Sequence, residues 1–547
     1  MRLPQMPNTR GRTRGVTVQF KGLDHTQGAQ DGAIWDMKNL TSKDYPVLST
    51  RFHRMHYGTV LNPQGFGTWD GLFWVSDGQF YYDGLPRGEV TDGKKSFGHL
   101  GAFVVILPDK AYYNVLTGDF GNIEAEYDGE AGTFAYNDGF YLGVPADKNA
   151  LQTTGDPFPF RIGDTISISG NTTIPANNRA SITIQGMSTD KKTLYFYDNS
   201  FYIPDSTRPF PIAEALTLKR SMPDIDYLTD NNNRLWGCKG DTIYASALGN
   251  IFDWTSGTIV SSTGAVNETG SWAAGVGSEG DFTACFAYRG QVLCFKEEIV
   301  YQVYGDLPSN FAYQPLATLG VMAGSDKSLA VAGETLFYLS RVGVMAYRGS
   351  IPEPITAAFG NERFEDGVAG SDGLKYYISM ADRNGNYRLY VYDAQLGMWH
   401  IEDETQVYGF AFYAENLYMM SAAGDINLIG DIFNEPDGLP PEPAFPWFCE
   451  FGDFIENEPN KKTAPKLLIR CELTPGSTAT VWVKYDSAGE WVKRWDWDGT
   501  VKQSYYVPLI PTRADYLRLR FEGVGDFRLY SLTREYTVGS GNRSYKI

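Results

Sequence analysis

Paired carboxylates are the residues in this chain whose types and spacing could perform chemistry. Hydrolysis of a glycosidic bond needs two carboxyl groups about 5 to 10 Å apart that flank the sugar, one of them with a raised pKa. The candidate carboxylates are Glu297, Glu298, Asp393, Glu402, Asp403, Glu456 and Glu458. Asp and Glu are also ordinary turn residues in an acidic β protein. We therefore interpret them as structural, assign no catalytic residue and predict that the protein is not an enzyme.

Histidines and known catalytic motifs add little to this picture. The five histidines form no H-E-x-x-H motif. His53 and His56 are close in sequence, and we interpret them as a surface or interface pair and not as metal ligands. Neither a G-x-S-x-G elbow nor a phosphate-binding loop occurs. The sequence predicts no cofactor.

Asp382, Asn384 and Asn386 have the spacing of the first three ligands of a calcium loop. Tyr387 stands where such a loop needs Gly, which argues against calcium. The dipeptide Asn384-Gly385 is instead the preferred turn of a β-hairpin. The sequence therefore predicts a hairpin here and no metal.

The five cysteines are Cys238, Cys285, Cys294, Cys449 and Cys471. Five cysteines in 547 residues make no disulfide framework, and no C-x-x-C motif occurs. Their neighbours are mostly apolar, so we predict reduced, buried thiols. Whether Cys285 and Cys294 face each other across a hairpin stays open at the level of sequence.

A repeated strand pattern between Arg234 and Gly430 must position most of these residues. Each repeat has an apolar run, a turn that contains Gly, and a second run. The runs begin at Arg234, Gln291, Thr335, Lys375 and Asn416, roughly 40 to 57 residues apart. Such spacing is typical of radially repeated β-sheets. Similar runs at 72–75 and 103–107 extend the pattern back to about Phe66. The sequence predicts a β-propeller.

Composition places the chain in the all-β class. Aromatic residues make up 14% of it and 59 residues are Gly, as expected for half-buried strands and their turns. The net charge of −18 excludes a general nucleic-acid binder, because phosphate contacts need an excess of Lys and Arg. No window of about 18 apolar residues could span a membrane. The start lacks the apolar core of a signal peptide, so synthesis in the cytoplasm is expected.

Breaks in the repeat indicate the domain organisation. The predicted segments are an N-terminal arm and entry segment (1–50), the first part of the β-propeller (51–156), an inserted small β-barrel (157–220), the remainder of the β-propeller (221–435), a Pro-rich linker (436–445) and a C-terminal β-sandwich of the jelly-roll or immunoglobulin-like kind (446–547). An oligonucleotide-binding barrel is the alternative for the insert. It is disfavoured because few basic residues there alternate with aromatic ones.

Several short sequence motifs resemble those of one family of phage virion proteins. They are Gly22-Leu23, Asp31-Gly32 with Asp36 and Asn39-Leu40, Pro46-Val47-Leu48-Ser49 with Arg51, the Gly-Asp-x-Ile-x-Ile-Ser-Gly run at 163–170, and Arg234-Leu235-Trp236 with Ile243-Tyr244-Ala245-Ser246. Together they resemble the tail nozzle and head-completion (stabilisation) proteins of short-tailed bacteriophages, which contain a β-propeller. The resemblance covers roughly residues 22–430.

The resemblance implies a structural protein of a phage tail. Such nozzle proteins form a hexameric ring, which conducts DNA during ejection and serves as an attachment platform. The implied partners are copies of the chain itself, other tail, adaptor or portal proteins, and tail fibres, while genomic DNA passes without specific binding. The implied location is the virion tail, after assembly in the host cytoplasm. We expect the negative charge to face the channel and repel DNA phosphate.

The N-terminal arm carries Arg2, Arg10, Arg12 and Arg14 before the first acidic residue, Asp24. Because this charge is opposite to that of the remaining chain, we predict that the arm contacts a neighbouring subunit. A flexible tail and contact with DNA are the alternatives.

Host recognition through glycan binding is the alternative function. Trp491, Trp495 and Trp497 lie close together in the predicted sandwich and could stack on sugar rings. The competing interpretation is that these side chains pack in the sandwich core or at an interface. The oligomeric state would separate the functions, since a ring favours the conduit and a trimer favours a receptor-binding fibre.

Overall fold

The structure, a computed structural model, describes residues 12–26, 31–139, 144–204, 209–257, 268–434, 436, 438–456, 461–486 and 489–538. These residues are all β, with three short 3-10 helices, Pro175–Asn177, Asp326–Ser328 and Ala357–Phe359, and no α-helix. No helix in the described ranges is long and apolar enough to cross a membrane. The chain forms two compact units. One is Asn62–Asp326, and the other combines Met1–Leu61 with Lys327–Ile547.

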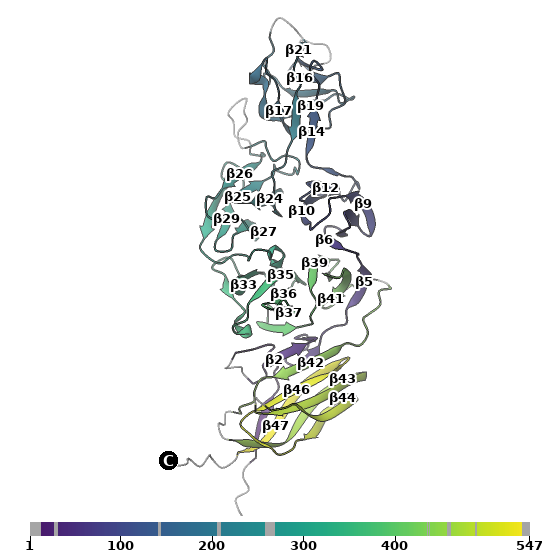
Figure 1. The fold of residues 1–547 in the computed structure, drawn as a ribbon, viewed down its shortest axis with the longest axis vertical. Helices are drawn as coiled ribbons and strands as arrows, with labels where there is room; N and C mark the ends of the chain where they lie inside the picture. Colours follow the sequence, from purple (N-terminus) through teal and green to yellow (C-terminus); the bar gives the residue numbers. More distant parts are fainter. Residues whose placement is uncertain are drawn as a thin grey trace, which may run out of the picture. The chain divides into compact units, whose positions relative to one another are not determined.

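The unit Asn62–Asp326 contains four antiparallel sheets of four strands, each built from consecutive strands of the chain (Figure 1). The first sheet has β6 (Pro63–Thr68), β7 (Leu72–Ser76), β8 (Gln79–Tyr82) and β9 (Leu85–Glu89). The second has β10 (Ser96–Leu100), β11 (Phe103–Leu107), β12 (Ala111–Asn114) and β13 (Phe120–Asn122). The third has β23 (Tyr227–Asn231), β24 (Arg234–Lys239), β25 (Thr242–Ala245) and β26 (Trp272–Gly275). The fourth has β27 (Ala284–Tyr288), β28 (Gln291–Phe295), β29 (Val300–Tyr304) and β30 (Ala312–Leu316).

The second strand of each of these sheets is the apolar run that the repeat pattern identified. These strands, β7, β11, β24 and β28, are buried on both faces along most of their length. They are buried because the sheets pack face to face; Trp236 of β24, for example, shares a core with Val292 of β28. The turns also follow the sequence, since Asp77 and Gly78 between β7 and β8 both have positive φ, as a two-residue hairpin turn requires.

Three further sheets of this kind belong to the other unit. One has β31 (Ala330–Ala332), β32 (Thr335–Ser340), β33 (Gly343–Tyr347) and β34 (Glu353–Pro354). The next has β35 (Phe364–Ser371), β36 (Lys375–Asp382), β37 (Tyr387–Asp393) and β38 (Met398–Ile401). The last has β39 (Val407–Tyr413), β40 (Asn416–Ser421), β41 (Asp425–Ile429) and, from the start of the chain, β5 (Met55–Thr59). The predicted β-propeller is thus confirmed, and β5 completes its last sheet.

An inserted β domain interrupts the series, and it begins earlier in the chain than predicted. Its first sheet has β14 (Ala125–Asp128), β22 (Thr217–Arg220), β17 (Thr165–Ser169) and β18 (Arg179–Thr183). Its second has β19 (Gly186–Met187), β20 (Thr193–Tyr197), β16 (Lys148–Thr153), β15 (Phe134–Asp138) and β21 (Phe210–Ile212). The two sheets enclose their own apolar core. The insert begins at β14 and not at the predicted residue 157, because β14, β15 and β16 pair with strands that come much later in the sequence.

The C-terminal sandwich contains strands from both ends of the chain. Its C-terminal strands are β42 (Pro446–Phe451), β43 (Lys462–Tyr485), β44 (Val492–Pro508), β45 (Arg513–Ala514), β46 (Leu517–Val524) and β47 (Phe527–Val538). Its N-terminal strands are β1 (Thr13–Thr17), β2 (Ile34–Lys38), β3 (Leu40–Thr41) and β4 (Leu48–Thr50). β2 pairs with β42 (Figure 1), while β1 and β4 pair with β47. All ten strands form one sheet that curls into a nearly closed, barrel-like sandwich.

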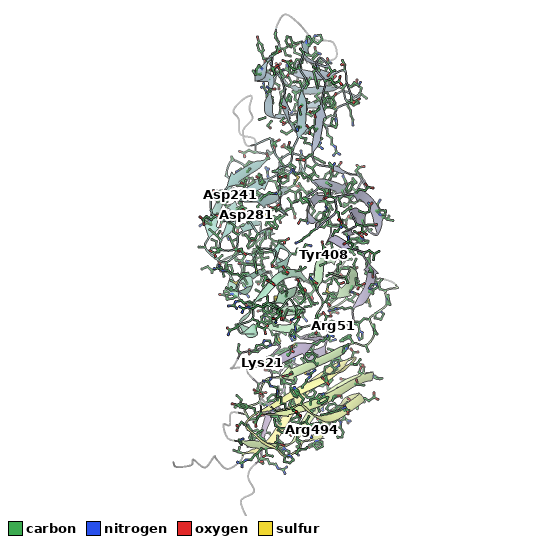
Figure 2. The ribbon with its side chains drawn as sticks, in the orientation of Figure 1. Lys21, Arg51, Asp241, Asp281, Tyr408 and Arg494 are labelled. Carbon is green, nitrogen blue, oxygen red and sulfur yellow. The ribbon has the colours of Figure 1, made fainter. Side chains whose placement is uncertain are left out.

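A buried ionic network connects the sandwich to the propeller sheets of the same unit. Arg54 contacts Glu402 at 2.8 Å and Asp403 at 2.7 Å, just after β38. Arg51, labelled in Figure 2, contacts Glu402 at 3.9 Å and forms a second ion pair with Glu442 of the predicted linker. Burial alone would raise the pKa of Asp403, but the charges of Arg54 and Arg51 and the hydrogen bonds from Thr405 together outweigh it and hold that pKa below its usual range. The linker is therefore fixed at Glu442 by charge pairing.

Candidate protein-interaction site

The strand β44 forms an open edge of the sandwich sheet. Among the described residues it pairs only with β43, from Val492 opposite Val483 to Pro508 opposite Lys466. The other side of β44 therefore presents backbone N–H and C=O groups without strand partners along 17 residues. An edge of this length is a ready template for pairing with another strand.

Most side chains of β44 are exposed on both faces of the sheet. Only Trp497 and Val507 are buried along the strand. Val501 is 71% exposed and Tyr506 is 64% exposed, although both have large apolar surfaces. Edge strands usually carry charges that prevent association; β44 carries charges of both signs, and exposed aromatic and aliphatic groups lie among them. This combination is typical of a surface that another chain covers.

Trp495 and Trp497 have different environments although they lie on the same face of β44. Trp495 is opposite Val481 and Trp497 is opposite Ala479, and both of these partners point into the core. Trp497 is buried, with its ring centre 6.0 Å from that of Tyr505. Trp495, on the same edge strand, remains 41% exposed.

Trp491, the third ring of the predicted glycan platform, lies outside β44. It is half-buried, and the ammonium group of Lys484 lies 5.8 Å from its ring centre. The three indoles therefore do not form one exposed platform. Trp497 packs in the core, as the competing interpretation expected, and only Trp495 offers a broad free face.

The described part of the arginine-rich arm lies on the chain's own sandwich. Arg12 and Arg14 both contact Glu535 of β47, at 2.8 Å and 3.5 Å, while β1 pairs along the same strand. Arg2 and Arg10 lie outside the described residues. Contact of the arm with a neighbouring subunit stays a prediction, and Arg12 and Arg14 have an acidic partner within the chain.

The candidate catalytic carboxylates lie in different parts of the fold, where their contacts stabilise the local structure. Glu402 and Asp403 belong to the ionic network around Arg54. Asp393 accepts hydrogen bonds from the backbone N–H of Gln395 and Leu396, which caps a turn.

The remaining candidates have similar structural contacts. Glu297 accepts a hydrogen bond from the backbone N–H of Ala323, and Glu456 pairs with the buried guanidinium of Arg534. Glu458 lies outside the described residues. The structural interpretation of these carboxylates is therefore the one that the contacts favour.

The calcium-like stretch is a hairpin turn, as predicted. Asp382 ends β36, and its carboxylate accepts hydrogen bonds from the backbone N–H groups of Asn384 and Asn386. Gly385 has φ +78°, the conformation that favours glycine. His53 and His56 are not joined in one site: His53 contacts Asp526, and His56 lies in the exposed part of β5.

Sequence reasoning missed a cluster of three thiols. All five cysteines are free and buried, as predicted. The sulfur atoms of Cys238, Cys285 and Cys294 lie within 4.8 Å of one another. Cys285 and Cys294 are directly opposite each other in the structure, a pairing that the sequence left open. Cys238 had no sequence signal that linked it to them, since it belongs to a different sheet.

Comparison with known proteins shows no family for this chain. No protein-family model and no curated protein matches the chain. BamB from Moraxella catarrhalis is similar at 12% identity and a TM-score of 0.34, over 71% of this chain and 99% of BamB. Raptor from Chaetomium thermophilum is similar at 11% identity and a TM-score of 0.29, over 70% of this chain and 29% of Raptor. PorZ, a bacterial surface component of the type-IX secretion system of Porphyromonas gingivalis, is similar at 10% identity and a TM-score of 0.25, over 88% of this chain and 89% of PorZ.

The predicted membership in the phage tail nozzle and head-completion family is wrong. None of these three similar structures is a phage tail protein, and no family model supports the resemblance. The matching phrases, such as Asp31-Gly32 and Ile243-Tyr244, are short and consist of common turn and strand residues. Such short motifs occur in any protein built from repeated β-hairpins, so they do not identify a family. The fold class holds, because the repeated four-stranded antiparallel sheets of the chain form a β-propeller.

Proposed function

We propose that the protein is a non-catalytic structural protein that assembles with a second copy of itself through β44. The open edge of this strand carries the proposal, because its outer backbone groups have no strand partner among the described residues and Trp495, Val501 and Tyr506 are exposed. Antiparallel addition of a strand would satisfy those backbone groups and cover the apolar side chains. The propeller and the insert would then be free to serve as a platform for other proteins, a role that the resemblance implied.

The charges along β44 favour a second copy over an unrelated strand. The midpoint of the strand is Thr500, so full antiparallel overlap of two copies places Asp498 opposite Lys502 of the second copy. The same overlap places Arg494, labelled in Figure 2, opposite Tyr506. Opposite charges that face each other across two strands contribute roughly 0.2–1 kcal/mol per pair, and a guanidinium over an aromatic ring is also attractive. Twofold symmetry repeats each contact.

A charge exchange tests this pairing. Lys502→Glu places a carboxylate opposite Asp498 of the second copy, and Asp498→Lys places two ammonium groups opposite each other. Each single variant should raise the dimer Kd about tenfold or more, because two repulsive pairs replace two attractive ones. The double variant Asp498→Lys/Lys502→Glu restores opposite charges and should restore the wild-type Kd. Sedimentation equilibrium of the full chain measures these constants.

Lys191→Glu is the matched control, since it changes the net charge equally in an exposed turn of the insert. This variant should dimerise like the wild type. A wild-type chain that is monomeric throughout the micromolar range would overturn the proposal. Equal dimerisation of the wild type and both single variants would overturn the role of β44, and circular dichroism would establish that each variant is folded.

The ring, the DNA conduit and the virion location stay predictions, since they followed from the resemblance and no observation tests them. The sedimentation measurement bears on them too. A closed ring of six copies would support the conduit and contradict the twofold dimer. A dimer that the charge exchange controls would contradict the ring.

Glycan binding is a second candidate, and the exposed ring of Trp495 is the observation that favours it. The apolar face of an aromatic ring can stack on a sugar ring. A single exposed ring, however, offers a smaller stacking area than the three rings that the sequence predicted. A glycan array with the full chain tests this function. Binding that Trp495→Ala abolishes would support it, and its absence would leave self-assembly as the function of this edge.

A further inference from the structure

Three of the five cysteines meet in the core between two adjacent propeller sheets of the unit Asn62–Asp326. Cys238 comes from β24, Cys285 from β27 and Cys294 from β28. The exposed fractions of Cys238 and Cys294 are 0%, and that of Cys285 is 6%. Cys285 and Cys294 are directly opposite each other in the antiparallel pair, so both side chains point the same way, toward Cys238 of the neighbouring sheet.

The distances between these sulfurs suit coordination of one ion. The sulfurs of Cys285 and Cys294 are 3.7 Å apart, and all three lie within 4.8 Å of one another. In a tetrahedral zinc site with bonds of about 2.3 Å, sulfurs are about 3.8 Å apart. Small side-chain rotations therefore bring the cluster to that geometry. The carbonyl oxygen of Ala284 lies 3.7 Å from the Cys238 sulfur and could supply a fourth, oxygen ligand.

A buried cation lies near the cluster. The side chain of Lys296 is 2% exposed, and its ammonium donates a hydrogen bond to the carbonyl of Ser278. Cys238, Asp241 and Asp281 all act on it electrostatically; the two carboxylates are labelled in Figure 2. A divalent ion with three thiolates has a net charge of −1. The positive charge of Lys296 would partly offset it, which reduces the cost of burying the site.

We propose that Cys238, Cys285 and Cys294 form a structural site for one thiophilic divalent ion of the zinc type. On binding, three thiol protons are released to solvent and three sulfur–metal bonds form. The ion would cross-link β24 of one sheet to β27 and β28 of the next. Because the sulfurs are buried, the ion enters while the chain folds.

Refolding the full chain with Zn²⁺ tests the site. After removal of free ion, elemental analysis should find one zinc per chain, and X-ray absorption should show three sulfur neighbours at about 2.3 Å. Refolding with Cd²⁺ should produce a thiolate-to-metal absorption band in the near ultraviolet. Cys285→Ser should weaken Cd²⁺ binding by at least about a hundredfold, because it removes one of three thiolate ligands.

Cys471→Ser is the matched control, since Cys471 is a buried thiol of the sandwich outside the cluster. It should keep one ion per chain. A wild-type chain that takes up no zinc, or zinc with no sulfur neighbours, would overturn the proposal, and these two measurements need no variant to fold. Equal Cd²⁺ affinity of Cys285→Ser and the wild type would also overturn it.

Discussion

Burial changes the chemistry of single residues in ways that their sequence neighbours do not indicate. His400 lies in β38 and is 2% exposed. Burial and, to a smaller extent, the charge of Lys375 lower its pKa to about 3, although Asp393 partly opposes the shift. The buried ring therefore stays neutral at pH values where a histidine in the unfolded chain is protonated, since an unperturbed histidine has a pKa of about 6.5.

The neutral His400 predicts a loss of stability in acid. Between about pH 6.5 and pH 3 the unfolded chain binds a proton that the folded chain does not, so the stability contribution is fully present above pH 6.5 and is lost as the pH falls. The loss is up to about 1.4 kcal/mol for each pH unit. His400→Gln should lose less stability than the wild type between pH 6.5 and pH 5, measured by urea denaturation.

His56→Gln, in the exposed strand β5, is the control for this measurement. It should retain the wild-type change in the free energy of unfolding between the two pH values. If His400→Gln shows the same change as well, the buried ring does not account for the acid sensitivity.

At the scale of elements, the last propeller sheet depends on a close backbone contact next to β5. Gly424, in the turn between β40 and β41, has φ +96°. The backbone N–H of Val60 donates to its carbonyl at 2.9 Å, and a Cβ at this glycine would lie 1.8 Å from the carbonyl oxygen of Val60. A glycine is therefore needed both for the left-handed conformation and for the close approach of the chain that leaves β5.

Gly424→Ala should therefore reduce the free energy of unfolding by at least about 2 kcal/mol, because strain and the clash add. Gly385→Ala is the matched variant: its φ is +78°, but a Cβ there meets no atom within 4 Å. It should lose only about 1 kcal/mol from backbone strain. Urea denaturation of both variants gives the comparison. Equal losses would mean that the contact with Val60 does not contribute.

At the scale of the whole molecule, the parts that fold together are not the parts that are contiguous in sequence. The sandwich needs β2 beside β42, and β1 and β4 beside β47. Ile34 and Met37 of β2 lie in the core that these strands share. The insert differs, because its first strand, β14, pairs with its last strand, β22, and its core contains only its own residues.

This difference predicts opposite behaviour of two fragments. Residues 446–547 alone should show no cooperative thermal transition, since two strand edges and part of the core lose their partners. Residues 124–221 alone should melt cooperatively, because their ends pair and their core is complete. Circular dichroism during heating distinguishes the two. A cooperative transition of the 446–547 fragment, at a temperature that added residues 12–50 do not change, would contradict the prediction.

The sequence by itself determined the all-β class, the propeller repeat and many of its turns. Runs such as Leu336-Phe337-Tyr338-Leu339 and turns such as Asn384-Gly385 are local signals, since side-chain alternation and backbone conformation depend on adjacent residues. The predicted family was wrong for the same reason: short local phrases describe hairpins in general. Local patterns predict that a strand exists and which of its faces is apolar, but they do not predict which other strand it pairs with.

Only the tertiary structure decided which strands pair. It placed β5 in the last propeller sheet and placed the four N-terminal strands, β1 through β4, in the sandwich. It also showed that the insert begins at β14. It also buried Trp497 while leaving Trp495 exposed, and it brought Cys238 to Cys285 and Cys294. These arrangements join residues far apart in the sequence. Burial of apolar surface stabilises the pairing of a strand with any neighbour that packs well against it. The packing of the whole fold therefore determines which strands pair.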